Sequence, residues 1–412
     1  MSSIQDIKIP EGWQQVNLDN NINILNWYAF KSDCFNEDWN WLPLIRIRDL
    51  QDSSISTYYD WKYPNQYIIK KWDLLVWMDW NFYTIKWDNV DALLNQRVCK
   101  VVSKWNIIFQ DYLFFHLKEE IKKIEEMTTG TTVLHLSSND IKKIYILVPK
   151  DLKEQEKIAE ILTTIDEDIE KTDKLIEKYK KIKAGLMEDL FTKGIDVTTG
   201  KPHTKFKDSE LGEIPESWKI KLVFMVTDYV DYRWKTPEKV EEGRFLVTAR
   251  NIKWWIIDYN LSQEFIKESD YDIVMSRGLP KIWDVLFTTE APMWEVANVD
   301  NEKIALAQRI IKFRWKNNKL NNYFLKYSFV SHYFVKLLKN ESAGSTVEWI
   351  KWSRLHNLSL KIPEMKEQEK IVEILVEADN KINKEEEYKE KLVKMKKWLM
   401  NDLLTGKVRV KF

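Results

Sequence analysis

Two stretches of the chain carry apolar residues at alternating spacings of four and three, flanked by Lys and Glu. The first runs from Leu152 to about Phe191 and has its apolar positions at Ile158, Leu162, Ile165, Ile169 and Ile176. The second carries charge at two of these positions, Glu385 and Lys389, and otherwise keeps the rhythm at Ile371, Leu375, Ile382 and Leu392. This heptad pattern predicts two long helices, and we expect their seams to pack against each other.

The ends of the first helix carry terminal signals. Asp151 and Glu154, three residues apart, predict a capping pair at its start, and Gly194 lies just past its end. The regions before the two helices contain short alternating runs between turn residues, which predict strands at Leu44–Arg48, Asp73–Val76, Phe245–Arg250 and Asp284–Phe287. Two further helices are expected, Asp111 to Met127 and Leu320 to Lys339. We predict an α+β domain before each long helix.

The two halves of the chain repeat each other. Lys153-Glu-Gln-Glu-Lys-Ile-Ala-Glu-Ile-Leu162 returns 213 residues later as Lys366-Glu-Gln-Glu-Lys-Ile-Val-Glu-Ile-Leu375, and Ile9-Pro-Glu-Gly-Trp13 returns as Ile214-Pro-Glu-Ser-Trp218. A period this long indicates a duplicated domain rather than a solenoid unit. The expected order is a first domain, a helix, a polar linker, a second domain, a helix and a tail, at residues 1–150, 151–195, 196–212, 213–363, 364–406 and 407–412.

The charge of the chain is balanced. Lys and Arg total 64, as do Asp and Glu. Without bulk positive charge, any nucleic-acid surface must be local. Cys34 and Cys99 are the only cysteines, and the N-terminus lacks a basic-then-apolar signal pattern. No apolar run approaches the roughly 18 residues of a membrane span. We expect a cytoplasmic protein that does not enter a membrane.

Tryptophan is unusually frequent, with 20 Trp against 10 Gly. Trp72 and Trp283 each precede Asp at the entry to an apolar run, where a turn favours glycine. We hypothesise that the gene comes from an organism that reads UGA as glycine; the alternative is that these are true surface aromatic residues. Trp13 and Trp218, which match each other in the repeat, are interpreted as genuine.

Motifs for catalysis are missing from the sequence. The five His residues are scattered without a second ligand at metal spacing, and no phosphate-binding glycine loop or nucleophile elbow occurs. No Asn-Pro-Pro or Asp-Pro-Pro run of adenine methyltransferases is present. We expect a protein that is not an enzyme and uses no cofactor or metal.

The repeated motifs resemble the specificity subunit of Type I restriction-modification systems over nearly the whole chain. Ile-Pro-Glu-X-Trp opens each half, Glu-Gln-Glu-Lys-Ile opens each helix, and the helices close with Gly185-Leu-Met-Glu-Asp-Leu-Phe-Thr-Lys-Gly194 and Leu399-Met-Asn-Asp-Leu-Leu-Thr-Gly406. The family carries Gly at several of the unusual Trp positions, including Trp72, Trp283, Trp349 and Trp398.

The resemblance implies two target-recognition domains and an antiparallel coiled coil of the two helices. It also implies binding to a bipartite site in double-stranded DNA, together with two methyltransferase subunits that dock on the helices and a motor-nuclease restriction subunit. About 38 helical residues span roughly 57 Å, whereas major-groove faces recur every 34–36 Å or so. Such helices would act as a ruler between two half-sites.

Candidate DNA-reading residues are polar or basic side chains in predicted strands and loops: Arg46, Arg48, Asn81, Tyr83, Thr131, Thr132, Arg233, Lys235, Arg250, Asn251, Ser345 and Thr346. Strand alternation places Arg46 and Arg48 on one face, where they can grip guanine or phosphate. The alternative for these arginines is an exposed, salt-bridged face. Gln96-Arg97 and Gln308-Arg309 recur in both halves, so we assign them to the scaffold.

Two other functions remain open on the sequence. A scaffold whose two domains bind only proteins would agree with the zero net charge. A fused methyltransferase or nuclease disagrees with the missing motifs.

Overall fold

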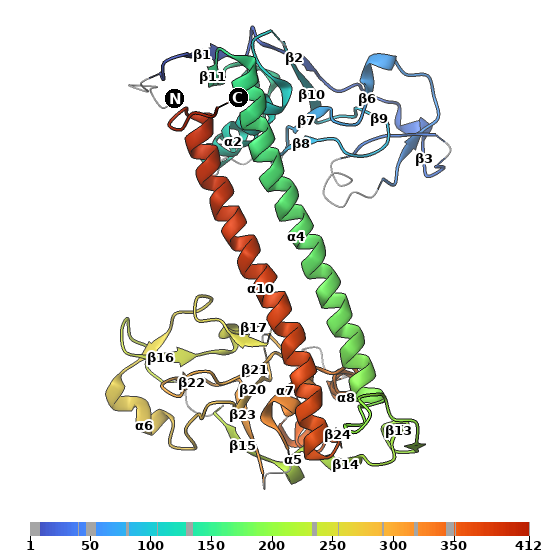
Figure 1. Ribbon diagram of the computed structural model, residues 1–412, viewed down its shortest axis with the longest axis vertical. Helices are drawn as coiled ribbons and strands as arrows, with labels where there is room; N and C mark the ends of the chain where they lie inside the picture. Colours follow the sequence, from blue (N-terminus) through green and yellow to red (C-terminus); the bar gives the residue numbers. More distant parts are fainter. Residues whose placement is uncertain are drawn as a thin grey trace. The chain divides into compact units, whose positions relative to one another are not determined.

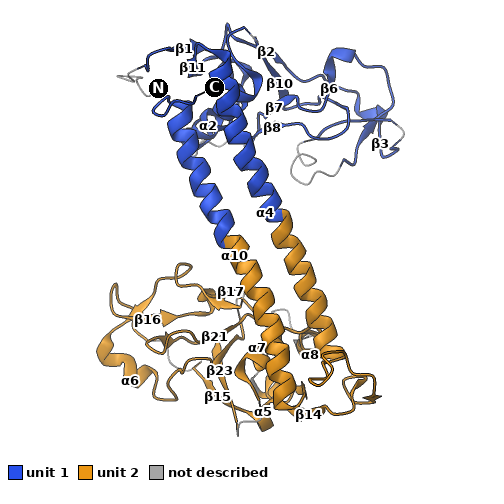
Figure 2. Cartoon of the chain, viewed as in Figure 1, with its two compact units in different colours: residues 1–173, 387–412 blue, residues 174–386 orange. Residues whose placement is uncertain are grey.

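The computed structural model describes residues 9–39, 41–46, 55–79, 82–104, 106–128, 135–232, 237–253, 255–290, 292–316, 320–342, 350 and 352–411. The chain divides into two compact units, shown in Figure 2. Unit 1 comprises Met1–Asp173 and Glu387–Phe412, and unit 2 comprises Lys174–Glu386. Each unit therefore combines one globular domain with parts of both long helices.

Unit 1 is an α+β domain built around a four-stranded antiparallel sheet in the order β2-β10-β7-β8 (Figure 1). Its strands are β1 (Trp13–Asn17), β2 (Ile22–Leu25), β3 (Phe35–Asn36), β4 (Leu42–Pro43), β5 (Tyr58–Tyr59), β6 (Ile68–Ile69), β7 (Leu74–Trp77), β8 (Thr84–Lys86), β9 (Ala92–Leu93), β10 (Val98–Ser103) and β11 (Tyr145–Pro149). Its helices are η1 (Ser32–Cys34), η2 (Asn65–Tyr67), α2 (Gln110–Thr128), α3 (Ser138–Lys142) and the first part of α4 (Leu152–Thr192).

Unit 2 repeats this plan with a sheet in the order β15-β23-β20-β21. Its strands are β12 (Phe206–Lys207), β13 (Ile214–Pro215), β14 (Lys219–Leu222), β15 (Thr227–Asp231), β16 (Arg244–Val247), β17 (Ile252–Lys253), β18 (Ile256–Ile257), β19 (Phe265–Ile266), β20 (Val285–Thr288), β21 (Val296–Asn298), β22 (Ala305–Leu306), β23 (Ile310–Trp315) and β24 (Ser359–Ile362). Its helices are α5 (Val223–Val226), η3 (Ala249–Asn251), η4 (Glu268–Asp270), α6 (Tyr271–Val274), α7 (Asn322–Val330), α8 (His332–Ser342), α9 (Trp352–Leu355) and part of α10 (Met365–Leu404).

The duplication seen in the sequence is present in the strand pairing. In unit 1, β1 begins at the Trp of the Ile-Pro-Glu-X-Trp motif and pairs antiparallel with β11, which precedes α4. In unit 2, β14 begins just after the Trp of the motif and pairs antiparallel with β24, which precedes α10. The main sheets also match strand for strand, because β2, β10, β7 and β8 correspond in order to β15, β23, β20 and β21. The same local patterns therefore fold in the same way twice.

Helices α4 and α10 run antiparallel within each unit, as the heptad pattern predicts. In unit 1, Asp166 pairs with Lys396, and Asp173 lies 2.5 Å from Lys389. In unit 2, Lys183 pairs with Asp379, and Lys180 lies 2.6 Å from Glu386. Lys389, which interrupts the apolar seam, is thus accommodated by an ion pair across the helices.

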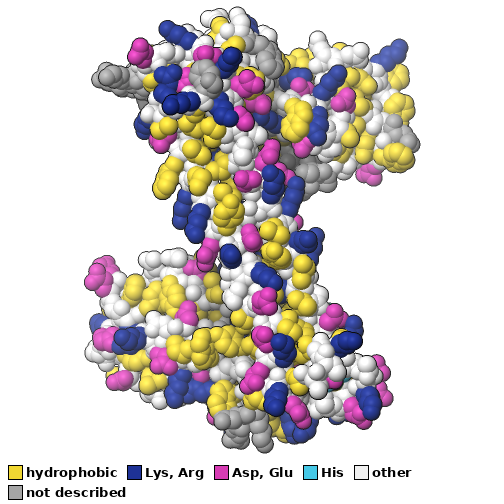
Figure 3. Space-filling model, in the orientation of Figure 1, with side chains coloured by type: hydrophobic (Ala, Val, Ile, Leu, Met, Phe, Trp, Pro, Cys, Tyr) yellow, Lys and Arg dark blue, Asp and Glu magenta, His cyan; other side chains and the backbone are white. Residues whose placement is uncertain are grey.

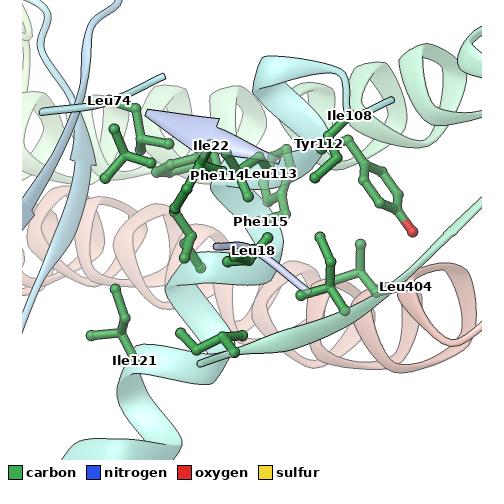
Figure 4. Packing of buried hydrophobic residues seen from close by; sticks show 14 of the residues in the cluster. Leu18, Ile22, Leu74, Ile108, Tyr112, Leu113, Phe114, Phe115, Ile121 and Leu404 are labelled. Carbon is green, nitrogen blue, oxygen red and sulfur yellow. The ribbon is translucent and has the colours of Figure 1, made fainter. Parts of the chain in front are cut away.

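Four of the nine seam side chains pack into the domain cores at the helix ends. In unit 1, Ile158 and Leu162 of α4 join Leu404 of α10 in a cluster with α2, which Figure 4 shows with Phe115 and Leu18. In unit 2, Ile371 and Leu375 of α10 join residues near the end of α4 in the equivalent core. Of the remaining seam positions, Ile169 is half-buried, while these are buried: Ile165, Ile176, Ile382 and Leu392.

Each repeated Trp packs against the glycine that follows the other long helix. A Cβ on Gly406 would lie 3.0 Å from the ring of Trp13, and a Cβ on Gly194 would lie 2.7 Å from the ring of Trp218. Both glycines have positive φ, 70° and 62° respectively. Because neither the space nor the backbone conformation accepts a side chain, these positions require glycine. Trp13 and Trp218 are correspondingly buried.

The Glu-Gln-Glu motif anchors each helix start rather than capping it. The side chain of Glu154 is buried and forms a bidentate ion pair with Arg409 at 2.6 and 2.7 Å, so it does not complete the predicted capping pair. Asp151 alone caps the helix, accepting from the Lys153 amide at 2.9 Å. Glu367 in unit 2 instead accepts from the Ile195 amide and contacts His203. The sequence pattern could not show these partners because they lie far along the chain.

Among the described residues, four Trp have a backbone conformation that favours glycine. Trp72 and Trp283, where the sequence predicts glycine-like turns, have φ of 74° and 75°, and Trp255 and Trp294 have φ of 71° and 64°. A bulky L-residue in this region costs roughly 1–2 kcal/mol. This finding agrees with the hypothesis that glycine is the natural residue, which itself stays a prediction.

Three predicted elements differ from the structure. At the strand expected over Leu44–Arg48, Leu44 forms only an isolated bridge with Leu93, Ile45 and Arg46 lie outside the strands, and residues 47 and 48 lie outside the described residues. The helix expected over Leu320–Lys339 is split into α7 and α8, because Ser331 adopts an extended backbone with ψ of 149°. The strand expected over Phe245–Arg250 ends at Val247, and Arg250 lies in η3 instead. Predicted strands and helices at Asp73–Val76, Asp284–Phe287 and Asp111–Met127 are confirmed within one or two residues.

Candidate nucleic-acid interface

A Gln-Arg turn leads into the strand β10 of unit 1 and leaves an arginine at the surface. Arg97 has a φ of 74°, and its carbonyl oxygen accepts a hydrogen bond from the Met78 amide at 2.9 Å. The Arg97 Nε lies 3.0 Å from Oδ2 of Asp79, whose other oxygen contacts Nδ1 of His135. The arginine backbone therefore closes the turn while its guanidinium stays half exposed.

Unit 2 repeats this arrangement in the turn before β23. Arg309 has a φ of 76°, and its carbonyl oxygen accepts from the Thr289 amide at 3.0 Å. The Arg309 Nε lies 3.4 Å from Oε2 of Glu290, the residue after Thr289. The sequence comparison assigned both Gln-Arg pairs to the scaffold. The backbone of both turns is part of the scaffold, as expected. The sequence did not indicate that the two guanidinium groups would reach solvent.

Arg309 borders a hollow of about 250 Å³ on the surface of unit 2. The hollow is lined by polar and basic side chains, chiefly Lys239, Thr248, Arg250, Gln308 and Arg309, with Glu264 the one acidic member. Lys239 forms an ion pair of 2.6 Å with Glu264. Lys239 is paired with Glu264 and Arg309 lies beside Glu290, so the three cations of the described lining face two carboxylates. The hollow therefore keeps a local positive charge despite the zero net charge of the chain.

Arg250 is presented by a rigid turn. The side-chain oxygen of Asn251 accepts from the Thr248 amide at 2.9 Å and from its hydroxyl at 2.8 Å. The Asn251 amide nitrogen donates to the carbonyl oxygens of Asp258 and Ser262. Asn251 is fully buried and its polar atoms are all engaged, so in this conformation it has none to offer a DNA base. Among the described residues, exposed Arg250 has no side-chain hydrogen bond or ion pair.

Two other candidates of unit 1 lie among the described residues, and each contacts a different aromatic side chain. Arg46 is half-buried with its guanidinium carbon 5.2 Å from the ring centre of Phe35. Tyr83 is 50% exposed and its ring lies 6.1 Å from that of Trp77. Eight candidates lie outside the described residues: Arg48, Asn81, Thr131, Thr132, Arg233, Lys235, Ser345 and Thr346.

Where α7 meets the long helices in unit 2, several charged and hydroxyl groups are enclosed. The Lys183 side chain is 2% exposed and pairs with Asp379, which also accepts from the Tyr327 hydroxyl at 2.6 Å. Burial lowers the pKa of Lys183, although Asp379 acts in the opposite direction. Burial also lowers the pKa of nearby Lys326 to about 8. Lys183, Asp379 and Tyr327 satisfy one another, and the Lys326 ammonium lies 4.7 Å from the ring centre of Tyr327, so the contacts of this cluster are structural.

The wider surface has no dominant charge in the view of Figure 3, where Lys and Arg side chains are interspersed with Asp and Glu. Within the described ranges, no helix is both long and apolar enough to cross a membrane. Exposed apolar side chains occur on the two long helices, including Ile182 of α4 and Tyr388, Val393 and Met395 of α10.

Comparison with known proteins identifies related chains. A family model described as the Type I restriction modification DNA specificity domain matches residues 10–178 and 205–394. The Type I restriction enzyme MjaVIII specificity subunit of Methanocaldococcus jannaschii is 30% identical over 98% of this chain and 95% of its own length. The EcoBI specificity subunit of Escherichia coli is 26% identical over 89% of this chain and 79% of its own.

The fold is also similar to a solved structure. The S subunit of a Type I restriction-modification system from M. genitalium superimposes with a TM-score of 0.61 at 15% identity, covering 97% of each chain. At this identity the likeness concerns the fold alone.

Proposed function

The chain belongs to the family of Type I restriction-modification DNA specificity domains, and we propose that each of its two domains reads one half of a bipartite DNA target. It is a specificity subunit, a non-catalytic component that assembles with other subunits of the system and binds DNA. In the proposed complex, two methyltransferase subunits modify the adenine of the target, and a motor-nuclease subunit cleaves unmodified DNA. The protein would act in the cytoplasm.

The observation that carries this proposal is a duplicated framework with different surroundings. Both units keep the same strand order and the same Gln-Arg turn beside a carboxylate. Around that framework the side chains differ: the carboxylate beside Arg97 is Asp79, which also contacts His135, whereas the carboxylate beside Arg309 is Glu290. A common framework with distinct neighbours is what two readers of different half-sites require, since base contacts determine specificity.

Helices α4 and α10 are proposed to set the spacing and to dock the methyltransferase subunits. At 1.5 Å per residue, the 41 residues of α4 extend about 60 Å, which exceeds the roughly 34–36 Å between successive major-groove faces. We therefore expect the two half-sites to be separated by a spacer that neither domain reads. The exposed apolar residues of both helices, such as Ile182 and Met395, would supply apolar contacts to a docked partner.

The balanced charge predicts weak DNA binding by the isolated chain. DNA affinity depends strongly on the number of phosphates that are neutralised, and acidic side chains accompany the basic ones over the surface seen in Figure 3. In the assembled complex, the methyltransferase subunits would supply many of the phosphate contacts.

Methylation mapping tests the function directly. The chain is co-expressed with its cognate methyltransferase subunit, and N6-methyladenine is mapped across the host genome. We expect a motif of two fixed parts separated by an unread spacer. A soluble, assembled complex that adds no methylation would instead support the alternative, a scaffold for proteins without DNA binding.

Domain replacement tests the division into two readers. Exchanging residues 1–150 for the corresponding domain of a relative should change one half of the methylated motif and leave the other half and the spacer intact. The matched exchange of residues 213–363 should change only the opposite half. A change in both halves after either single exchange would contradict separate readers.

A further inference from the structure

We propose that the hollow bordered by Arg250 and Arg309 binds one phosphodiester group of the DNA backbone, with Arg97 as the counterpart of Arg309 in unit 1. This inference rests on the proposed function and names contacts that would orient each domain on DNA. Arginine suits this role because its guanidinium presents several donors in a plane and can bind two phosphate oxygens together.

Both arginines of the Gln-Arg turns have a strained backbone conformation. Arg97 and Arg309 both occupy the positive-φ region, at 74° and 76°. A residue with a side chain costs roughly 1–2 kcal/mol there relative to the right-handed conformation, and glycine would avoid most of that cost. Such strain tends to persist where a side chain has a function. The presence of arginine at the equivalent turn of both units therefore indicates a use for its guanidinium.

The internal ion pair of unit 2 does not account for Arg309. The side chains of Arg309 and Glu290 are 50% and 42% exposed, and their closest pair of atoms is 3.4 Å apart. An exposed pair of this kind contributes about 0–1 kcal/mol, which does not offset the backbone strain. A phosphate can replace Glu290 as the partner of Arg309 at little cost.

Arg250, the second arginine of the hollow, is carried by a turn that is already fixed in position. Asn251 fixes η3 through four internal hydrogen bonds, so Arg250 is presented by a backbone that needs no reordering. Lys239 already neutralises Glu264 at 2.6 Å, which limits repulsion of an anion in the hollow. Two guanidinium groups and the Gln308 side-chain amide line the same space as donors, whereas the Thr248 hydroxyl already donates to Asn251.

A phosphate fits better than a base because the key residues are shared between the units. The Gln-Arg pair occurs at 96–97 and at 308–309, and Arg48 occupies the sequence position that corresponds to Arg250. Two domains that read different half-sites would differ in their base contacts, whereas the DNA backbone is the same at both. Phosphate contacts fix the position of a protein on DNA without carrying sequence information.

The test uses the full chain co-purified with its methyltransferase subunits and measures DNA binding over a range of salt concentrations. The variants are Arg309→Gly, Arg250→Ala and Arg97→Gly. Each should weaken binding about tenfold at 0.1 M salt, because one fewer counterion is released from DNA. The slope of log K against log salt should fall by roughly one for each variant. The methylated motif should remain unchanged.

Arg309→Gly and Arg97→Gly should also unfold at a higher temperature than the parent chain, because glycine relieves the strained φ. This expected gain in stability separates lost DNA contact from misfolding. The matched control is Arg354→Ala, which removes an arginine of similar exposure, 53%, that pairs with Glu341 outside the hollow. Its affinity and salt slope should equal those of the parent complex.

Unchanged affinity and salt slope in Arg309→Gly and Arg250→Ala, in a parent complex that binds DNA, would overturn this inference and leave the proposed function intact. A relaxed methylation motif in these variants would also overturn it, because it would indicate a base contact. A parent complex that fails to bind DNA would instead contradict the proposed function itself.

Discussion

In each unit, an equivalent Lys–Asp ion pair joins α4 and α10 beside the globular domain, but the surroundings of the two pairs differ. In unit 1, Lys396 pairs with Asp166, and its ammonium lies 6.0 Å from the ring centre of Phe115 on α2. In unit 2, Lys183 pairs with Asp379, and Tyr327 on α7 donates a hydrogen bond to the same aspartate. The unit 2 lysine is 2% exposed and the unit 1 lysine 14% exposed.

This difference shows how a duplicated ion pair can contribute differently to the stability of the two units. A lysine that is almost fully removed from water depends on its carboxylate partner, since an unpaired buried charge is strongly destabilising. The hydroxyl of Tyr327 helps to hold Asp379 in place, whereas Phe115 offers no such bond. Unit 2 is therefore expected to be more sensitive to changes at its junction than unit 1.

The largest effect is expected on removing the aspartate. Asp379→Ala should lower the stability of unit 2 by about 3 kcal/mol, because it leaves Lys183 buried without a partner. The matched change Asp166→Ala should cost unit 1 only about 1 kcal/mol, since Lys396 can reach water. Amide hydrogen exchange of α7 and α2 reports the two units separately. Equal losses in both units would contradict the comparison.

A smaller effect, equal in the two units, is expected at the equivalent tryptophans. Trp72→Gly and Trp283→Gly should each stabilise the chain by about 1–2 kcal/mol, because both residues have positive φ. Their side chains are 60% and 50% exposed, so little apolar burial is lost. Thermal unfolding measures the gain. Trp218→Gly is the control and should be strongly destabilising, because Trp218 is fully buried.

Mass spectrometry of the native protein examines the underlying hypothesis. Peptides that contain glycine at positions 72 and 283 are expected if UGA is read as glycine. Peptides that contain tryptophan at both positions would show that the strained residues are natural.

The smallest effect is a pH dependence of the stability of unit 2 that comes from Lys326. Burial lowers the pKa of Lys326 to about 8, from an ordinary value of 10.5. The protonated side chain is disfavoured in the fold, so the destabilisation is complete well below pH 8 and disappears as the pH rises toward 10.5. Between pH 7 and pH 9, the stability of unit 2 should rise by about 1 kcal/mol from this residue. Hydrogen exchange of α7 measures it, and Lys326→Met should abolish the rise.

Local patterns in the sequence predicted most of the framework. The heptads gave α4 and α10 because their period depends only on the residues of one helix, and the strands β7 and β20 followed from short apolar runs. The internal repeat predicted two similar domains. In the predicted capping pair a distant partner decided the outcome, because Arg409 binds Glu154. The helix expected over Leu320–Lys339 is instead interrupted locally, by the extended backbone of Ser331. The burial of Asn251 by its bonds to Asp258 and Ser262 was not visible in the strand pattern.

The sequence by itself determined the duplication, the order of the elements, the coiled-coil seams and the family resemblance. Only the tertiary structure decided which side chains reach the surface and which of them meet. Arg250 and Arg309 lie far apart in the chain and border the same hollow, because β16 pairs in parallel with β22 and so aligns the turns that follow the two strands. The physical reason is that helix and strand periods are local properties, whereas a surface site depends on long-range pairing and on the burial that packing imposes.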